Sequence, residues 1–131
     1  MNVAVVIAGG TGSRMKSNIP KQFMCVQNIP IIIYSLINAQ RCSKIDEIVA
    51  VVPEGWLNFL DKYLIEFRIT KFKETVIGGT TRQESTYNAF ICLSNYLNDE
   101  DVVCLIDANR PLMPIEIIEK MWNLHSSMAA P

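Results

Sequence analysis

A glycine-rich loop with two cationic side chains is the first part of this sequence that could do chemistry. Residues 8–22 are AGGTGSRMKSNIPKQ, and the glycines are Gly9, Gly10 and Gly12. Glycines let the backbone bend and bring N–H groups close to an anion. Arg14 and Lys21 add positive charge, and Pro20 restricts the chain beside the lysine. This composition suits a polyphosphate; the alternative is a tight turn between strand and helix with solvated cations.

Two common phosphate-binding motifs do not fit this loop. A Walker A loop needs Gly-Lys-Ser/Thr at a fixed spacing, which is absent here. A dinucleotide-binding fingerprint needs a third glycine, and Met15 occupies that position. The loop is therefore a different kind of anion site.

A second segment, residues 78–85, is GGTTRQES. Thr81 and Glu84 match a capping box, Thr-x-x-Glu, which predicts the start of a helix. Capping does not require two glycines after a strand, and these suggest close approach of a ligand. Arg82 and Ser85 would then face that ligand from the first helical turn.

A third segment, residues 106–111, is IDANRP. Asp107 comes just after an apolar stretch, and a carboxylate there is a natural Mg²⁺ contact because Mg²⁺ bridges one or two carboxylates to phosphates. The alternative is a turn-forming Asp107 paired with Arg110.

The elements that must position these segments alternate between strand and helix. Buried strands are predicted at residues 3–8 and 45–52, a short strand at 74–77 and a fourth strand at 102–106. A further short strand is predicted at 22–26, before a turn at 27–28. Helices are predicted at 31–41, along the apolar stripes 57–67 and 90–97, and from Pro114 onward. The three isoleucines at 31–33 also fit a strand. This order indicates an α/β fold with a mostly parallel sheet and helices on both faces. Ligands bind such sheets beyond the carboxyl ends of the strands, where the three segments fall.

Composition narrows the classes of function. The 131 residues carry 12 basic and 13 acidic side chains, a net charge of −1, which gives no electrostatic signature of nucleic-acid binding. No apolar run approaches the roughly 20 residues of a membrane span, and no signal peptide is predicted. The cysteines at 25, 42, 92 and 104 form no CxxC motif. We therefore expect a cytoplasmic protein without structural zinc or disulfides, and with neither a nucleic-acid nor a membrane partner.

Taken together, the three segments resemble the 2-C-methyl-D-erythritol 4-phosphate cytidylyltransferase family, which includes related polyol-phosphate cytidylyltransferases. The shared motifs are AGGxGxRM at 8–15, PKQF at 20–23, GGxxRQxS at 78–85 and DAxRP at 107–111. Their order and spacing agree with the family through essentially the whole chain.

The resemblance implies a Rossmann-like, doubly wound fold of the nucleotide-diphospho-sugar transferase type, which uses CTP and a divalent cation, Mg²⁺. Arg14 and Lys21 would stabilise the transition state at the α-phosphate, Asp107 would contact the metal or the reacting phosphates, and Arg110 would lie on the acceptor side. The implied nucleotide-binding residues are Ala8, Gly9, Gly10, Gly12, Gly79, Thr80, Arg82 and Ser85.

The implied reaction is attack of the acceptor phosphate on the α-phosphorus of CTP, with release of pyrophosphate. A phosphate monoester is largely a dianion at neutral pH, since its second pKa is about 6, so no general base is needed. The reaction needs cations that suppress anion repulsion and stabilise the developing charge. A set of cations without a nucleophile or triad matches this requirement.

The acceptor expected first is 2-C-methyl-D-erythritol 4-phosphate, of isoprenoid precursor synthesis; ribitol 5-phosphate, of cell-wall or capsule synthesis, is the nearest alternative. The family commonly has His where Ile106 stands and a small residue where Asn109 stands, and either departure fits another acceptor. A hexose-1-phosphate nucleotidyltransferase is a weaker alternative.

We expect residues 1–131 to form a single nucleotidyltransferase domain, incomplete at its C-terminus. A non-catalytic nucleotide-binding module therefore also remains an alternative. The family implies a homodimer when full-length.

Overall fold

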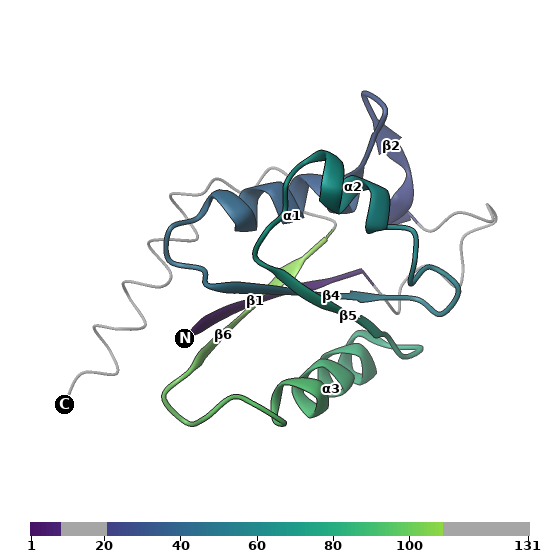
Figure 1. Ribbon diagram of the computed structural model, residues 1–131. Helices are drawn as coiled ribbons and strands as arrows, with labels where there is room; N and C mark the ends of the chain where they lie inside the picture. The colour runs from purple at the N-terminus through teal and green to yellow at the C-terminus, as the bar shows by residue number, and fades with distance from the viewer. Residues whose placement is uncertain (9–20, 109–131) are drawn as a thin grey trace.

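A four-stranded parallel sheet forms the centre of the structure, a computed structural model that describes residues 1–8 and 21–108 (Figure 1). The strands lie in the order β5-β4-β1-β6 and every neighbouring pair is parallel. Their bounds are β1 (Asn2–Ile7), β4 (Glu47–Val52), β5 (Phe72–Ile77) and β6 (Val102–Asp107). The strands predicted at 3–8, 45–52, 74–77 and 102–106 are confirmed, with bounds that differ by up to two residues.

Helices cover both faces of this sheet (Figure 1). The helices α1 (Ile31–Arg41) and α2 (Asp61–Glu66) lie on one face, and α3 (Arg82–Leu93) lies on the other. Side chains alternate along β1: Ala4 and Val6 belong to the core under α1, whereas Val3 and Val5 belong to the core under α3. Burial on both faces explains why β1 has no polar alternation, and the predicted layering is confirmed.

The segment from residue 31 forms a helix rather than a strand. Pro30 precedes its first turn, with φ −57° and ψ 143°, and lacks the N–H that a helix interior would need. Ile32, Ile33 and Leu36 are fully buried, while Ile31 and Tyr34 are partly exposed. This one-sided burial is the helical pattern, so the predicted helix at 31–41 is confirmed.

The predicted strand at 22–26 is wrong over its first half. Residues Lys21–Phe23 form a 3₁₀ helix, η2, and only β2 (Cys25–Val26) is extended, paired with β3 (Ile29–Pro30) as a short antiparallel hairpin. The reason is tertiary packing: Phe23 is buried and stacks on Trp56, with ring centroids 4.6 Å apart. Propensity along the chain does not encode this contact.

The helices along the two predicted apolar stripes have other bounds than the stripes do. The helix α2 has only six residues. Leu57 and Leu60, which begin the predicted stripe, pack in the core from turns that precede this helix. The helix α3 ends at Leu93, and Leu97 packs on the same core from the turn beyond. The helix predicted from Pro114 lies outside the described residues.

The hairpin turn places two non-glycine residues in the left-handed region. Gln27 has φ 53° and Asn28 has φ 67°, the signs that a two-residue hairpin turn requires. The predicted turn at 27–28 is thereby confirmed. Asn tolerates this conformation well, whereas a longer side chain such as that of Gln27 is less suited to it.

We expect Gln27→Asn to raise the free energy of unfolding by about 0.5 kcal/mol, because Asn adopts positive φ at lower cost. The matched variant Gln27→Val should lower it by about 1 kcal/mol, since a β-branched residue fits this region poorly. Urea unfolding of both variants measures the difference. Equal stability of the two would contradict the assigned backbone conformation.

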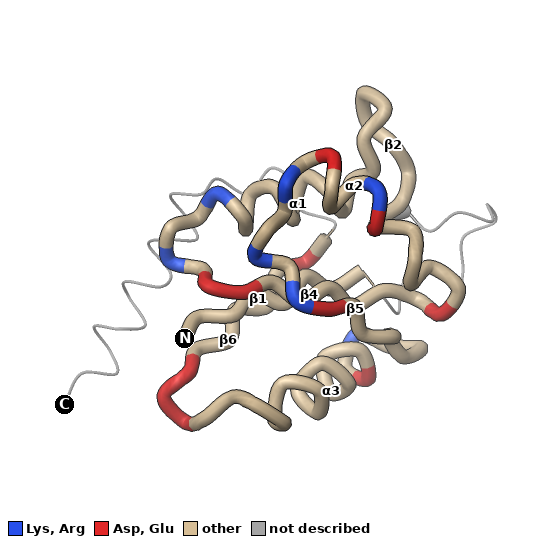
Figure 2. Tube along the Cα trace, in the orientation of Figure 1, with Lys and Arg blue, Asp and Glu red and all other residues tan. Residues whose placement is uncertain are grey.

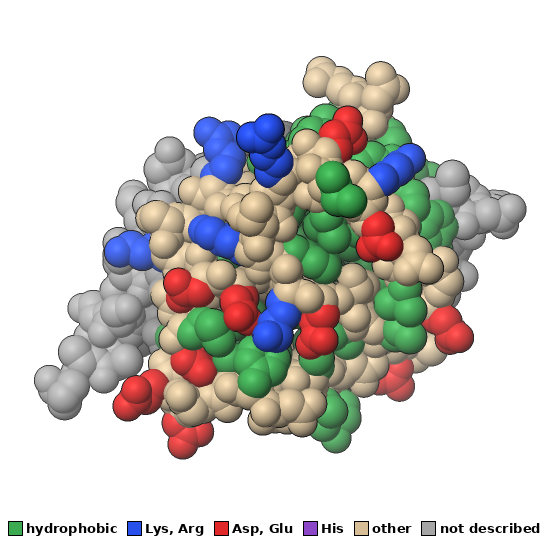
Figure 3. Space-filling view, in the orientation of Figure 1, with side chains coloured by type: hydrophobic (Ala, Val, Ile, Leu, Met, Phe, Trp, Pro, Cys, Tyr) green, Lys and Arg blue, Asp and Glu red, His purple; other side chains and the backbone are tan. Residues whose placement is uncertain are grey.

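Charges of both signs are spread over the face shown in Figure 3, with basic side chains over α1 and α2 and acidic ones mostly below them. The part of the chain that the structure describes contains no helix long and apolar enough to cross a membrane.

All four cysteines are free. The Cys92 thiol donates a hydrogen bond to the Glu74 carboxylate, and burial together with this carboxylate raises the pKa of Cys92 to about 11.

Candidate functional site

The carboxyl ends of the strands meet at one edge of the sheet. The Ala8 N–H donates to the Val51 carbonyl at 2.7 Å, and the Ala108 N–H donates to the Ile7 carbonyl at 3.1 Å. The Gly78 N–H donates to the Val52 carbonyl at 2.7 Å. The three segments singled out in the sequence therefore start side by side, directly after β1, β5 and β6.

The second segment forms a tightly bonded N-terminus of α3. The Thr81 hydroxyl accepts a hydrogen bond from the Glu84 N–H at 3.1 Å, which confirms the predicted cap. The Glu84 carboxylate accepts from the N–H and the hydroxyl of Thr80, at 2.7 and 2.9 Å. These bonds to Thr80, foremost the one from its N–H, hold the pKa of Glu84 below its usual value. The first turn is thus fixed by its own side chains.

The glycine-containing loop before α3 is also held by hydrogen bonds to side chains of α3 itself. Ser85 is fully buried, and its hydroxyl accepts a hydrogen bond from the Gly79 N–H at 3.1 Å. A Cβ at position 79 would collide with the Glu84 side chain, so glycine is required there for packing. Asn88 donates from Nδ2 to the Ile77 carbonyl at 3.1 Å. The loop is held rigidly, which suits the recognition of a flat ligand.

Replacing Thr81 by Ala should lower the free energy of unfolding by about 0.5–2 kcal/mol, because the first N–H groups of α3 lose their acceptor. Thr81→Ser keeps the hydroxyl and should remain close to the parent protein. Thermal or urea unfolding measures both variants. A stable Thr81→Ala protein would show that the cap contributes nothing to α3.

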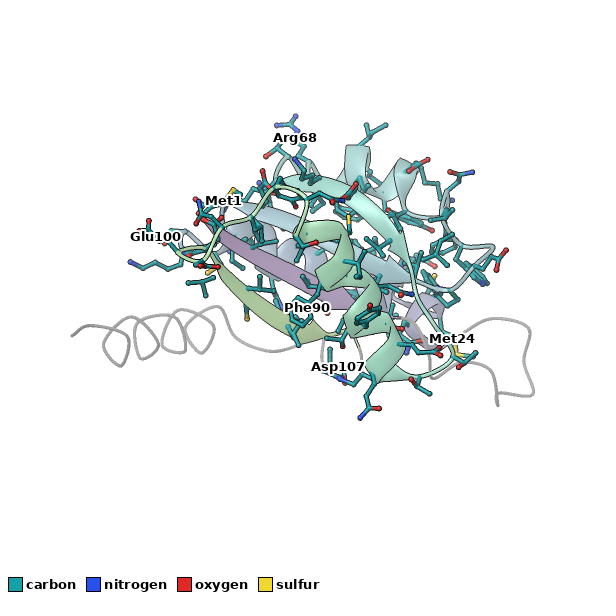
Figure 4. The ribbon with its side chains drawn as sticks, turned by 90° about the horizontal axis from the view of Figure 1, so that it is seen from below. Met1, Met24, Arg68, Phe90, Glu100 and Asp107 are labelled. Carbon is teal, nitrogen blue, oxygen red and sulfur yellow. The ribbon has the colours of Figure 1, made fainter. Side chains whose placement is uncertain are left out.

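An ion pair connects the second and third segments. Arg82 Nη1 lies 3.1 Å from Asp107 Oδ2, across 25 positions of sequence. Figure 4 views the sheet from the side of α3 and shows Asp107 beside this helix, where β6 ends. The sequence offered Arg110 as an alternative partner of Asp107, but Arg110 lies outside the described residues. The observed partner, Arg82, was not expected.

A hollow of about 310 Å³ opens next to this ion pair, lined by Arg82, Gln83, Thr86, Tyr87 and Phe90. Charge on α3 is confined to the end where Arg82 and Glu84 stand (Figure 2). Among the residues that line the hollow, only Arg82 is charged, and it lies toward the carboxyl edge of the sheet.

The structure brings together part of the predicted site. Ala8, Gly79, Thr80, Arg82, Ser85 and Asp107 all lie at or just beyond the carboxyl ends of the strands. The backbone of Lys21 belongs to η2. Gly9, Gly10, Gly12, Arg14 and Arg110 lie outside the described residues, so their roles stay predictions.

Besides the Arg82–Asp107 ion pair, two further contacts of the site were not anticipated from the sequence. Asn88 anchors the end of β5, and its only signal was its place after the second motif. The Thr80 N–H donates a hydrogen bond to the Glu84 carboxylate, a contact that the Thr-x-x-Glu motif alone does not predict.

The chain is similar to known cytidylyltransferases. The family model described as IspD: 2-C-methyl-D-erythritol 4-phosphate cytidylyltransferase matches residues 2–130. A ribitol-5-phosphate cytidylyltransferase of Vibrio parahaemolyticus is 41% identical over 92% of this chain and 51% of its own length. A protein of that name from Lacticaseibacillus paracasei is 42% identical over 90% of this chain and 50% of its own. A 2-C-methyl-D-erythritol 4-phosphate cytidylyltransferase of Clostridium acetobutylicum is 37% identical over 91% and 51%.

A solved structure agrees on the fold. The 4-diphosphocytidyl-2C-methyl-D-erythritol synthase of Anaerococcus prevotii superposes with a TM-score of 0.73 at 24% identity, over 94% of this chain and 49% of that one. The chain spans about half the length of the curated relatives that it matches. Sequence motifs, sheet order and family model agree: the chain belongs to the 2-C-methyl-D-erythritol 4-phosphate cytidylyltransferase (IspD) family.

Proposed function

We propose that this chain supplies the CTP-binding part of an enzyme that transfers CMP from CTP to a polyol phosphate and releases pyrophosphate. The observation that carries the proposal is the contact of 3.1 Å between Arg82 and Asp107, which unites the second and third motif segments at the carboxyl edge of the sheet. Ligands of open α/β sheets bind at this edge. Membership of the family supports the same conclusion.

The loop before α3 suits cytosine. The N–H groups of Gly79 and Thr80 are already bonded to Ser85 and Glu84. Within residues 1–8 and 21–108, the carbonyl oxygens of Gly78 and Gly79 accept no hydrogen bond. The loop therefore offers acceptors rather than donors to a base, and the exocyclic amine of cytosine is a donor where uracil has an acceptor. We infer a preference for CTP over UTP.

The chemistry follows from charge rather than from proton transfer. The acceptor phosphate attacks the α-phosphorus as a dianion, and the bond to the leaving pyrophosphate breaks. In the proposal, backbone groups of residues 8–12 hold the nucleotide, and Arg14 and Lys21 stabilise the charge that develops on the α-phosphate. Arg110 orients the acceptor.

Asp107 fits a metal that is shared with substrate. It is a single, partly exposed carboxylate, and the described residues contain no group of three His, Cys, Asp or Glu side chains that could hold an ion alone. Mg²⁺ is commonly held by one or two carboxylates together with substrate phosphates. When bound, Mg²⁺ would neutralise charge on the phosphates and act as a Lewis acid.

Two acceptors are proposed. The sequence motifs favour 2-C-methyl-D-erythritol 4-phosphate, the compound in the family's description. The relatives at 41% and 42% identity are named for ribitol 5-phosphate, and this favours ribitol 5-phosphate as the second candidate.

The free cysteines support a reducing, cytoplasmic location for the protein. The homodimer that the family resemblance implies stays a prediction.

Calorimetry and a pyrophosphate assay test the proposal. We expect CTP with Mg²⁺ to bind more tightly than UTP with Mg²⁺, and pyrophosphate release to require one of the two acceptors. Binding without release on either acceptor would support a non-catalytic nucleotide-binding module instead. Absence of CTP binding would overturn the proposal.

A further inference from the structure

We propose that Arg82 is a positioning residue that serves as a built-in counter-ion for Asp107 and competes with the divalent cation for its carboxylate. The inference rests on the proposed function, because it concerns the metal that would accompany CTP. It adds a role for Arg82 beyond contact with the nucleotide: the guanidinium holds the metal ligand in place before the metal arrives and is displaced when it binds.

The position of Arg82 in α3 needs an explanation. It is the first helical residue, where the positive end of the helix dipole disfavours a cation. The carboxylate of Glu84, in the same turn, is bonded to Thr80, and Arg82 forms its ion pair with Asp107 instead. The described partner that makes this arginine favourable is Asp107 on β6. The side chain of Arg82 therefore reaches across to β6 for its ion pair and does not pair within its own helix.

The geometry makes the pair exchangeable. The side chains of Arg82 and Asp107 are 49% and 29% exposed, and they are joined through Nη1 and Oδ2 at 3.1 Å. An ion pair this open to water is weak, since solvent screens its attraction. A doubly charged ion held at the same time by phosphates interacts more strongly with the carboxylate. Beside the pair, the hollow along α3 gives the released guanidinium room to move.

The pair also matters before the metal binds. The Asp107 carboxylate and the triphosphate repel each other, since both are anions. Arg82 reduces that repulsion and keeps the carboxylate oriented toward the edge. Removing Arg82 should therefore weaken CTP binding in the absence of metal, yet strengthen metal binding once CTP is bound.

Mn²⁺ binding, followed by electron paramagnetic resonance, tests the competition. With saturating CTP, Arg82→Gln should bind Mn²⁺ about two- to fivefold more tightly than the parent, the range expected for removal of one exposed competing charge. Arg82→Lys keeps the charge and should stay near the parent. In an Asp107→Asn background, Arg82→Gln should cause no further change, because the shared ligand is gone. Calorimetry without metal should show weaker CTP binding in Arg82→Gln.

The control variant is Arg68→Gln, which removes the same charge from an exposed position far from Asp107 (Figure 4). It should leave Mn²⁺ affinity unchanged. Unchanged or weaker Mn²⁺ affinity in Arg82→Gln, with CTP still bound by the parent, would overturn the competition but leave the proposed function intact. Failure of the parent to bind CTP with Mn²⁺ would overturn both. Circular dichroism of each variant establishes that the fold is kept.

Discussion

Replacing Lys21 by Ala is expected to slow pyrophosphate release about 10²–10³-fold, the usual effect of removing one preorganised charge at a transition state. The proposed reaction joins two anions, and the α-phosphate gains charge as the acceptor oxygen approaches. A positive charge beside the α-phosphate lowers that barrier. The backbone of Lys21 opens the 3₁₀ helix η2, and Phe23 of the same helix stacks on Trp56.

The loss should appear in kcat more than in KM, because the charge that Lys21 stabilises develops during the reaction. Lys44→Ala, at an exposed position that precedes β4, is the matched control and should retain the parent rate. Calorimetry with CTP and thermal unfolding separate loss of chemistry from loss of binding or fold. A Lys21→Ala protein that releases pyrophosphate at the parent rate would remove the lysine from the mechanism.

Burial was the part of the fold that the sequence predicted best. The runs at 3–8 and 45–52 are continuously apolar, and in the structure β1 and β4 are covered on both faces. The sequence also predicted the helix at 31–41 at its observed bounds. Each of these patterns lies within one short segment of the sequence. Composition identifies the buried strands, and the spacing of apolar residues identifies the helix.

Contacts between distant segments were harder to predict. Residues 22–26 have strand-like composition, but stacking of Phe23 on Trp56 replaces half of that strand with a turn of 3₁₀ helix. The same limit applies to the site: the sequence placed Asp107 and Arg82 at one edge of the sheet, yet the choice of Arg82 as partner depends on where the first turn of α3 lies relative to the end of β6. Spacing along the chain carries no information about that placement.

Asp107→Asn is expected to slow metal-dependent pyrophosphate release by about 10²-fold, because the carboxylate would be the protein's contribution to the metal that steadies the phosphates. Asn has nearly the same shape and can still accept a hydrogen bond from Arg82. The pair is largely open to water, so the free energy of unfolding should change by less than about 1 kcal/mol.

The metal dependence distinguishes this role from a purely structural one. If Asp107 holds the ion, the Asn variant should need a higher Mg²⁺ concentration for half-maximal rate, and excess Mg²⁺ should recover part of the loss. Asp99→Asn, an exposed carboxylate before β6, is the control and should leave the Mg²⁺ dependence unchanged. A slower Asp107→Asn enzyme with the parent's Mg²⁺ dependence would mean that Asp107 acts on the phosphates or on Arg82 alone. The ion would then have to be held by other groups, because its proposed ligand would contribute nothing to its affinity.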